Sequence, residues 1–148
     1  MQGRCQCDAV RFTTPVPNPF KWFVCHCLEC RRQSSSAFGI SAIFPAFDIR
    51  AAATKGGDEI GVFTHSNTAS GNTKTCYFCK RCGTRFMHHG HGGANVAVKG
   101  GCLDDVDGDC LASATHIWTK RALMPIPEGA ESWPEDAPEP EPKSDAAP

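Results

Sequence analysis

The chain has 148 residues, of which 41% are hydrophobic and 21% are charged, as in an ordinary folded domain. No apolar stretch approaches the ~20 residues of a membrane-spanning helix, and the first residues lack the apolar segment of a signal peptide. The formal net charge is −1, but residues 128–148 carry seven acidic residues, which leaves residues 1–127 at a formal +5. This surplus is too small to predict nucleic-acid binding, which requires a strong basic stripe.

Ten cysteines are the unusual feature of the composition. Seven of them are clustered as C-x-C at 5–7, C-x-C-x-x-C at 25–30 and C-x-x-C at 79–82. Without a signal peptide we expect a reducing, cytoplasmic environment, where clustered cysteines bind metal more often than they form disulfides. We therefore predict metal sites in place of a disulfide framework.

The predicted elements are mostly short strands, separated by turns rich in Gly, Pro, Ser and Asn. Residues 9–14 alternate as in a strand, 22–24 form a short buried strand, and 28–33 form one or two helical turns. Further strands are expected at 37–44 and 59–64, just before Cys79, and at 85–87 and 95–99, and the final ordered element at 114–123. We expect surface connections at 46–58, 65–75 and 90–93.

This pattern predicts a single, mainly β domain over residues 1–127. From Glu128 onward, prolines alternate with Glu, Asp and Ala. Such a composition cannot bury a hydrophobic core, so we predict that residues 128–148 form an acidic, Pro-rich, disordered tail.

The outer cysteine pairs predict a structural zinc site. Cys5 and Cys7 are separated by one residue and therefore point to the same face of an extended strand. Cys79-Lys80-Arg81-Cys82-Gly83 has the form of a zinc knuckle, whose turn presents backbone N–H groups to the sulfurs and ends in a glycine. The two pairs together would supply the four cysteine ligands of a closed site.

The middle cysteines, Cys25, Cys27 and Cys30, predict a second zinc. Three protein ligands leave one position of a four-coordinate ion open, as in catalytic zinc sites. An alternative stays open, in which Cys76, His26 or His116 completes this site and makes it structural. The spacing lacks the ferredoxin pattern that would favour an iron–sulfur cluster.

Other polar and cysteine residues have simpler interpretations. Cys102 and Cys110 are expected to be small core residues. The histidines at 88, 89 and 91 are expected to be exposed in a turn, and the acidic run at 104–109 to be a surface turn, because it lacks the final glutamate of a calcium loop. Arg31 and Arg32 either form a solvated helix face or hold an anionic ligand near the second zinc.

The motifs Gly3-x-Cys5-x-Cys7-x-Ala9-Val10-Arg11-Phe12, Cys25-His26-Cys27-x-x-Cys30-Arg31-Arg32 and Phe78-Cys79-x-x-Cys82-Gly83-Thr84 occur in this order. Together with His116-Ile117-Trp118, this pattern resembles the glutathione-dependent formaldehyde-activating family, or CENP-V/GFA domain, over about residues 2–127. The resemblance implies an Mss4-like fold of several small twisted antiparallel sheets. It also implies a structural zinc at Cys5, Cys7, Cys79 and Cys82, a second zinc at Cys25, Cys27 and Cys30, and carbon–sulfur lyase activity that condenses glutathione with formaldehyde.

We therefore predict a zinc-dependent enzyme acting on a glutathione-like thiol and a small aldehyde, with no nucleic-acid or membrane partner. The thiol would take the open position at the Cys25, Cys27 and Cys30 site, and Arg31, Arg32 or Lys21 would bind its carboxylates. The alternative hypothesis is a non-enzymatic zinc module that binds a macromolecular partner.

Overall fold

The computed structural model describes residues 1–69, 71–90 and 93–138. It is mainly β, as predicted, and among the described residues the helices are short. The strands are β1 (Gln2–Arg4), β2 (Arg11–Thr13), β3 (Lys21–Cys25), β4 (Gly39–Pro45), β5 (Ala53–Lys55), β6 (Ile60–His65), β7 (Lys74–Cys79), β8 (Arg85–Gly90), β9 (Asn95–Lys99) and β10 (Thr115–Ile117). The helices are α1 (Leu28–Ser34) and α2 (Gly108–Ala112), with 3-10 turns at η1 (Gly57–Glu59), η2 (Gly100–Cys102) and η3 (Thr119–Arg121).

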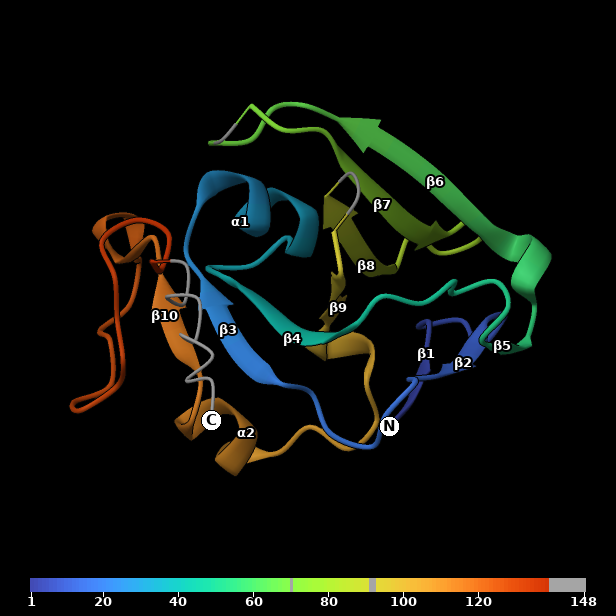
Figure 1. Ribbon diagram of the computed structural model, residues 1–148, viewed down its shortest axis with the longest axis horizontal. Coiled ribbons are helices and arrows are strands. Elements are labelled where there is room, and N and C mark those ends of the chain that lie inside the picture. Colours follow the sequence, from blue (N-terminus) through green and yellow to red (C-terminus); the bar gives the residue numbers. More distant parts are fainter. Residues whose placement is uncertain (70, 91–92, 139–148) are drawn as a thin grey trace, which may run out of the picture.

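The strands form two sheets (Figure 1). The larger has the strand order β10-β3-β4-β9-β8-β7-β6, and the smaller has the order β1-β2-β5. Only the pairing of β10 with β3 is parallel among the strand pairs of the described residues; the others are antiparallel. Most strands are short and pair with a strand that is next to them in the sequence. This agrees with the predicted pattern of short alternating segments separated by turns.

The hydrophobic core joins the small sheet to one face of the large sheet. Phe12 on β2 and Phe86 on β8 are fully buried and meet edge to face, with ring centroids 5.7 Å apart. Ala42 and Phe44 on β4 and Val98 on β9 belong to the same core. The residues between these positions, such as Ser41, Ile43, Ala97 and Lys99, point the other way, so the core lies on one face of β4 and β9.

The opposite face of the large sheet carries the polar side chains and α1. Residues that alternate with the core positions, such as Ser41 on β4 and Lys99 on β9, point away from the core and lie opposite each other in register. A Cβ built on Gly39 of β4 would lie 3.2 Å from the Cβ of Cys30, so the helix carrying Cys30 packs closely on β4. The absence of a side chain at Gly39 therefore allows α1 to approach the sheet.

Several predicted elements agree with the structure and others need correction. The helix expected at 28–33 and the strands expected at 37–44, 59–64 and 95–99 are present within one or two residues. The connection expected at 46–58 instead contains β5 and the buried Ile49. β1 was not predicted, because three residues are too short to show a period. The extended strand expected at Cys5 and Cys7 is instead a turn, in which the Asp8 N–H donates to the Cys5 carbonyl at 3.1 Å.

The histidines expected in an exposed turn lie partly on a strand. β8 continues to Gly90, so that His88 and His89 are half-buried within the large sheet. Strand pairing with β7 on one side and β9 on the other explains their burial. His91 lies outside the described residues.

The first part of the segment that was expected to be a disordered tail, from Glu128 onward, is ordered and is hydrogen-bonded to β10. The backbone N–H of His116 on β10 donates to the carbonyl of Glu131 at 2.8 Å, and that of Trp133 donates to the carbonyl of His116 at 2.8 Å. The Thr115 hydroxyl also donates to the Glu131 carboxylate at 2.6 Å. The disorder expected from Glu128 is therefore wrong up to at least Glu135, and residues 139–148 lie outside the described part.

Within the described ranges, none of the helices has the length and apolar character needed to traverse a bilayer.

Candidate metal centres

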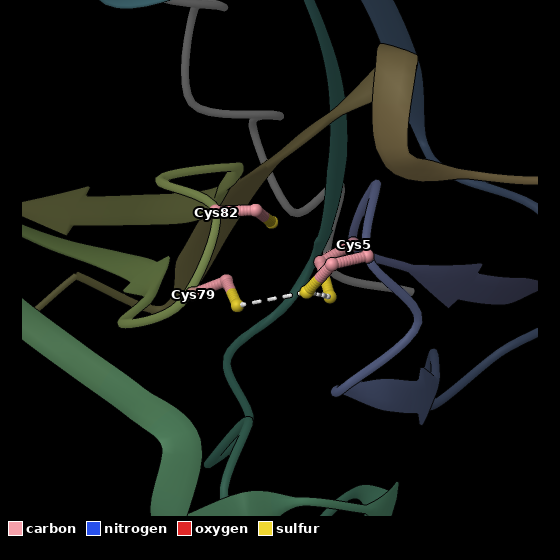
Figure 2. A group of neighbouring side chains, drawn as sticks. Cys5, Cys79 and Cys82 are labelled. Atoms are coloured by element: carbon pink, nitrogen blue, oxygen red, sulfur yellow. Dashed lines mark hydrogen bonds between the residues drawn. The ribbon is translucent and has the colours of Figure 1, made fainter.

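The first cluster joins two segments that are far apart in sequence. Cys5 and Cys7 follow β1, and Cys79 and Cys82 lie at the end of β7 and in the turn before β8. Within that turn, the N–H of Gly83 donates to the Cys79 carbonyl at 2.9 Å, and Gly83 has φ 76°, a conformation that glycine adopts readily. Figure 2 shows Cys5, Cys79 and Cys82 directing their sulfurs into one space between the two segments.

The spacing of these sulfurs fits a tetrahedral zinc. The four Sγ atoms all lie within 4.8 Å of one another. The Sγ atoms of Cys5 and Cys7 are 3.6 Å apart, and those of Cys7 and Cys79 are 3.9 Å apart. A tetrahedron with Zn–S bonds of about 2.3 Å has S···S edges of about 3.8 Å. The distances agree with that edge, and all the cysteines in the described residues are free thiols.

Local hydrogen bonds favour the thiolate at Cys82, whereas burial and hydrogen bonds with neighbouring thiols raise the pKa of Cys7 to about 12 and burial raises the pKa of Cys79. The amide of Val10 donates to Cys5 Sγ at 3.3 Å, and the Thr84 hydroxyl lies 3.2 Å from Cys82 Sγ. Burial alone would raise the pKa of Cys82, but the hydrogen bonds of Thr84 and the neighbouring cysteines outweigh it and hold that pKa at about 5. A thiolate at neutral pH is the form that binds metal.

The second cluster is built by the end of β3 and the start of α1. β3 delivers Cys25, and Cys27 caps α1, its sulfur accepting the Cys30 N–H at 3.3 Å. Cys30 lies in the first turn of that helix, and Gln33 Nε2 donates to its sulfur at 3.3 Å. Helix capping thus turns three residues that are close in sequence toward one point.

The sulfurs of Cys25, Cys27 and Cys30 also lie within 4.8 Å of one another, which fits three ligands of one ion. Among the described residues, no other histidine, cysteine or carboxylate ligand atom joins this group. The ligand atoms of Cys76, His26 and His116, the alternative fourth ligands, are not part of this group. Cys25 is buried, whereas Cys27 and Cys30 are half-buried, so the trio is accessible from one side.

The electrostatics of the trio single out Cys27. Hydrogen bonds from the thiols of Cys25 and then Cys30, together with backbone N–H groups, hold the pKa of Cys27 far below its usual value. The pKa of Cys25 is raised, first by its hydrogen bond to Cys27. One anionic sulfur is thus favoured even before a cation is bound.

The residues that form both clusters also match a known protein family. A family model described as glutathione-dependent formaldehyde-activating enzyme matches residues 1–121, which include both cysteine clusters. The chain belongs to this family.

A crystal structure of a Rhodobacter sphaeroides protein from a structural genomics programme resembles this family member, with a TM-score of 0.58 and 23% sequence identity. The match covers 78% of this chain and 99% of the other. At this identity the likeness concerns the fold alone. The search of curated proteins found no match. The two sheets and paired cysteine clusters agree with the expected Mss4-like fold.

Of the cations predicted to bind a ligand, two lie on α1, and the third lies at the opposite end of β3 from Cys25. Arg32 is exposed and forms an ion pair with Glu29, while Arg31 is half-buried in the last turn of the helix. Lys21, at the start of β3, pairs with Glu131 at 3.0 Å. An anion role for these three stays a prediction, and two of them already have carboxylate partners.

Sequence reasoning missed the buried polar residues around the trio. Lys99 is 8% exposed, and its Nζ donates to Ser41 Oγ at 3.1 Å. Burial lowers the pKa of Lys99, whereas the thiols of Cys30 and Cys25 raise it. A lysine that ends an apolar strand normally reaches solvent, so nothing in the local sequence marked this one as buried beside the cysteines.

A histidine pair supports the loop that carries the trio. His26, fully buried, lies between Cys25 and Cys27, and its Nε2 is 3.1 Å from Nδ1 of His116. The His26 N–H also donates to the Ile117 carbonyl at 3.0 Å. The family motifs contain both histidines, and the fold brings them together through the parallel pairing of β10 with β3. They therefore position the loop and are not ligands in this arrangement.

Proposed function

We propose that the protein catalyses the reversible addition of a glutathione-like thiol to a small aldehyde at Cys25, Cys27 and Cys30. The observation that supports this most directly is the contrast between the clusters. One brings together four sulfurs, whereas the other brings together three, with no further protein ligand among the described residues. A closed site suits structure, and an incomplete one suits a substrate atom.

In the proposed reaction the thiol sulfur forms a bond to the carbonyl carbon, the C=O double bond becomes a single bond, and the thiol proton ends on the former carbonyl oxygen. A zinc held by the trio would supply the positive charge that keeps an incoming thiol ionised at neutral pH. Cys25 anchors the site from the buried side, and the half-buried Cys27 and Cys30 face the approach of the substrate. The reverse reaction breaks the same C–S bond.

The donor set favours sulfur chemistry over hydrolysis. Three anionic sulfurs offset the charge of a divalent ion, so this set polarises a water molecule less than neutral histidine ligands do. Burial lowers the pKa of Lys99, the charges of Cys30 and Cys25 oppose that shift, and its ammonium counters the negative charge of the thiolates. Together these groups suit an anionic sulfur at the vacant position.

The test compares Cys27→Ser with Cys110→Ser in the full zinc-loaded chain. Cys110 is half-buried and belongs to neither cluster, so its substitution controls for the loss of a thiol. We expect Cys27→Ser to lower glutathione-dependent formaldehyde consumption by more than about 100-fold, because even supporting residues of metal sites contribute about 10–100-fold. Bound zinc should fall from two ions per chain to one, and Cys110→Ser should match the wild type in both measurements.

If the wild type binds two zinc ions but shows no thiol-dependent turnover with any small aldehyde, the enzyme hypothesis is wrong. The non-enzymatic binding module would then be the better account of the trio.

A further inference from the structure

The polar face of the large sheet extends well beyond the trio. α1 packs on β4, and the same face continues across β9, β8 and β7 toward β6 (Figure 1). In register, Cys25 lies opposite Gly39, and Ser41, two residues along the same strand, lies opposite Lys99. Since alternate residues share a face, Cys25, Ser41 and Lys99 point to the same side of the sheet.

The next strands add further polar side chains to this face. His88 on β8 is paired with Cys76 on β7 on one side and with Ala97 on β9 on the other. Ala97 is two residues from Lys99 along β9, so His88 and Lys99 share a face. Lys74 is two residues from Cys76, and its Nζ lies 4.0 Å from a Cβ built on Gly90. Lys99, His88 and Lys74 therefore follow one another across the same face.

Arg85 joins the same group from the start of β8. Its Cζ lies 6.0 Å from the ring centroid of Phe63 on β6, and Phe63 is paired in register with Cys76. The pKa of His88 is held well below its ordinary value by burial first, and then by the charges of Lys99, Lys74 and Arg85. Three cations thus gather around one neutral histidine.

No carboxylate balances these cations within the described ranges. The ion pairs found there involve other residues, namely Arg4, Arg11, Lys21, Arg32, Lys55, Arg81 and Lys120. Lys99 is 8% exposed and has a neutral hydroxyl, that of Ser41, as its hydrogen-bond partner. The anionic groups near Lys99 are the sulfurs of Cys30 and Cys25, whereas Arg85 and Lys74 have no carboxylate partner in the described part of the chain, so an anionic ligand would balance their charge.

The connection between β6 and β7 reaches α1, the helix that packs on β4. Asn67, in the connection between β6 and β7, donates from Nδ2 to Glu29 Oε1 on α1 at 3.2 Å. This hydrogen bond joins the loop to the helix that carries Cys30. The Glu29 carboxylate also pairs with Arg32, so it already has its own cation.

We propose that Lys99, Arg85 and Lys74 form a carboxylate subsite for the thiol substrate whose sulfur binds at the cysteine trio. This inference rests on the proposed function, because it assumes that a thiol occupies the trio. It assigns recognition of the carboxylate to the strands β7, β8 and β9, not to Arg31 and Arg32 of α1. Charge-assisted hydrogen bonds from an ammonium and a guanidinium to a carboxylate supply the selectivity.

The experiment measures binding to the zinc-loaded full chain by calorimetry, without aldehyde. The probes are 3-mercaptopropionate and its amide, which differ only in the carboxylate. We expect the wild type to bind the acid about tenfold more tightly or better, the usual effect of a hydrogen bond to a charged group. Arg85→Met and Lys74→Met should each reduce this preference to about twofold while leaving the affinity for the amide unchanged.

Lys120→Met is the matched control, because it removes a lysine that pairs with Glu135 away from this face. It should keep the full preference for the acid. The inference is overturned if Arg85→Met weakens both probes equally, if the preference survives in both variants, or if neither probe binds the wild type. Zinc content and thermal unfolding of each variant establish that it is folded.

Binding and turnover are measured separately, so that failure of the subsite can be distinguished from failure of the proposed function. A preference for the acid without any aldehyde turnover would support the subsite and contradict the proposed function. Turnover without the preference would contradict the subsite alone.

Discussion

At the scale of single residues, the second metal centre depends on a glycine that carries no ligand atom. Gly39 lies opposite Cys25 in register, and its missing side chain lets Cys30 approach the sheet. A methyl group there would lie 3.2 Å from the Cβ of Cys30 and 3.4 Å from its carbonyl oxygen. The distance between β4 and α1, and with it the spacing of the sulfurs, is set by this contact.

We expect Gly39→Ala to lower the zinc affinity of the trio by about tenfold, the lower end of the effect of residues that orient metal ligands. The helix must shift by a few tenths of an ångström, which moves Cys30 away from Cys25. Competition with a chromophoric chelator measures the affinity of each site.

Gly101→Ala is the control, because a Cβ at Gly101 meets nothing within 4 Å. It should leave both zinc affinities unchanged. An unaltered trio affinity in Gly39→Ala would show that α1 moves with the sulfurs as one unit.

At the scale of elements, β10 is held from both sides. It pairs with β3 in parallel, and its residue His116 exchanges backbone hydrogen bonds with Glu131 and Trp133. The Glu131 carboxylate accepts hydrogen bonds from Thr115, Lys21 and the Trp133 indole. The acidic segment is therefore ordered where it is bonded to β10. It is connected to the trio because His116 contacts His26, which lies between Cys25 and Cys27.

We expect Glu131→Gln to weaken this attachment, so that the backbone N–H groups of His116 and Trp133 exchange with solvent faster than in the wild type at pH 7. Hydrogen bonds from Thr115 and then Lys21 lower the pKa of Glu131 to about 2. A lowered folded-state pKa means that the contact is fully present above the usual pKa and is lost as the pH falls through about 2. Amide exchange followed by NMR measures the effect.

Glu128→Gln is the matched control, because Glu128 is exposed and lies in the same segment. Its exchange rates should equal those of the wild type. Equal protection in Glu131→Gln would show that the backbone pairing alone holds the segment.

At the scale of the whole molecule, the two clusters hold different parts of the fold together. The first joins the segment after β1 to the turn after β7, and it borders the core through Cys5 and Cys79, both fully buried. The second joins only the end of β3 to the adjacent helix α1. Closing the longer loop removes more freedom from the unfolded chain.

We therefore expect Cys79→Ser to destabilise the protein far more than Cys27→Ser. Structural zinc contributes on the order of 10–16 kcal/mol in small peptides, and domains of this size are stable by about 5–15 kcal/mol. Cys79→Ser should lower Tm by at least about 10 °C or abolish cooperative unfolding. Cys27→Ser should shift Tm by less than about 5 °C.

Thermal unfolding followed by circular dichroism, with zinc content measured in parallel, distinguishes these outcomes. Equal shifts in the two variants would mean that both sites are structural.

The sequence by itself determined both candidate metal sites and the mainly β character of the chain. Cysteines separated by one or two residues chelate through local geometry, which spacing alone specifies for Cys25, Cys27 and Cys30. Alternation and turn residues likewise predict strands such as β4 and β9, because these signals come from neighbouring positions. The family motifs then related the outer cysteine pairs to one site.

Only the tertiary structure decided what surrounds the trio. The separation of Cys76, His26 and His116 from the group of three sulfurs, the burial of Lys99 and the attachment of residues 131–135 to β10 all depend on strand pairing. These contacts join residues that are distant in the chain, and the charge or size of a residue does not specify its distant partner. A lysine or an acidic segment that appears solvent-exposed from composition becomes buried or paired when the sheet brings its partner to it.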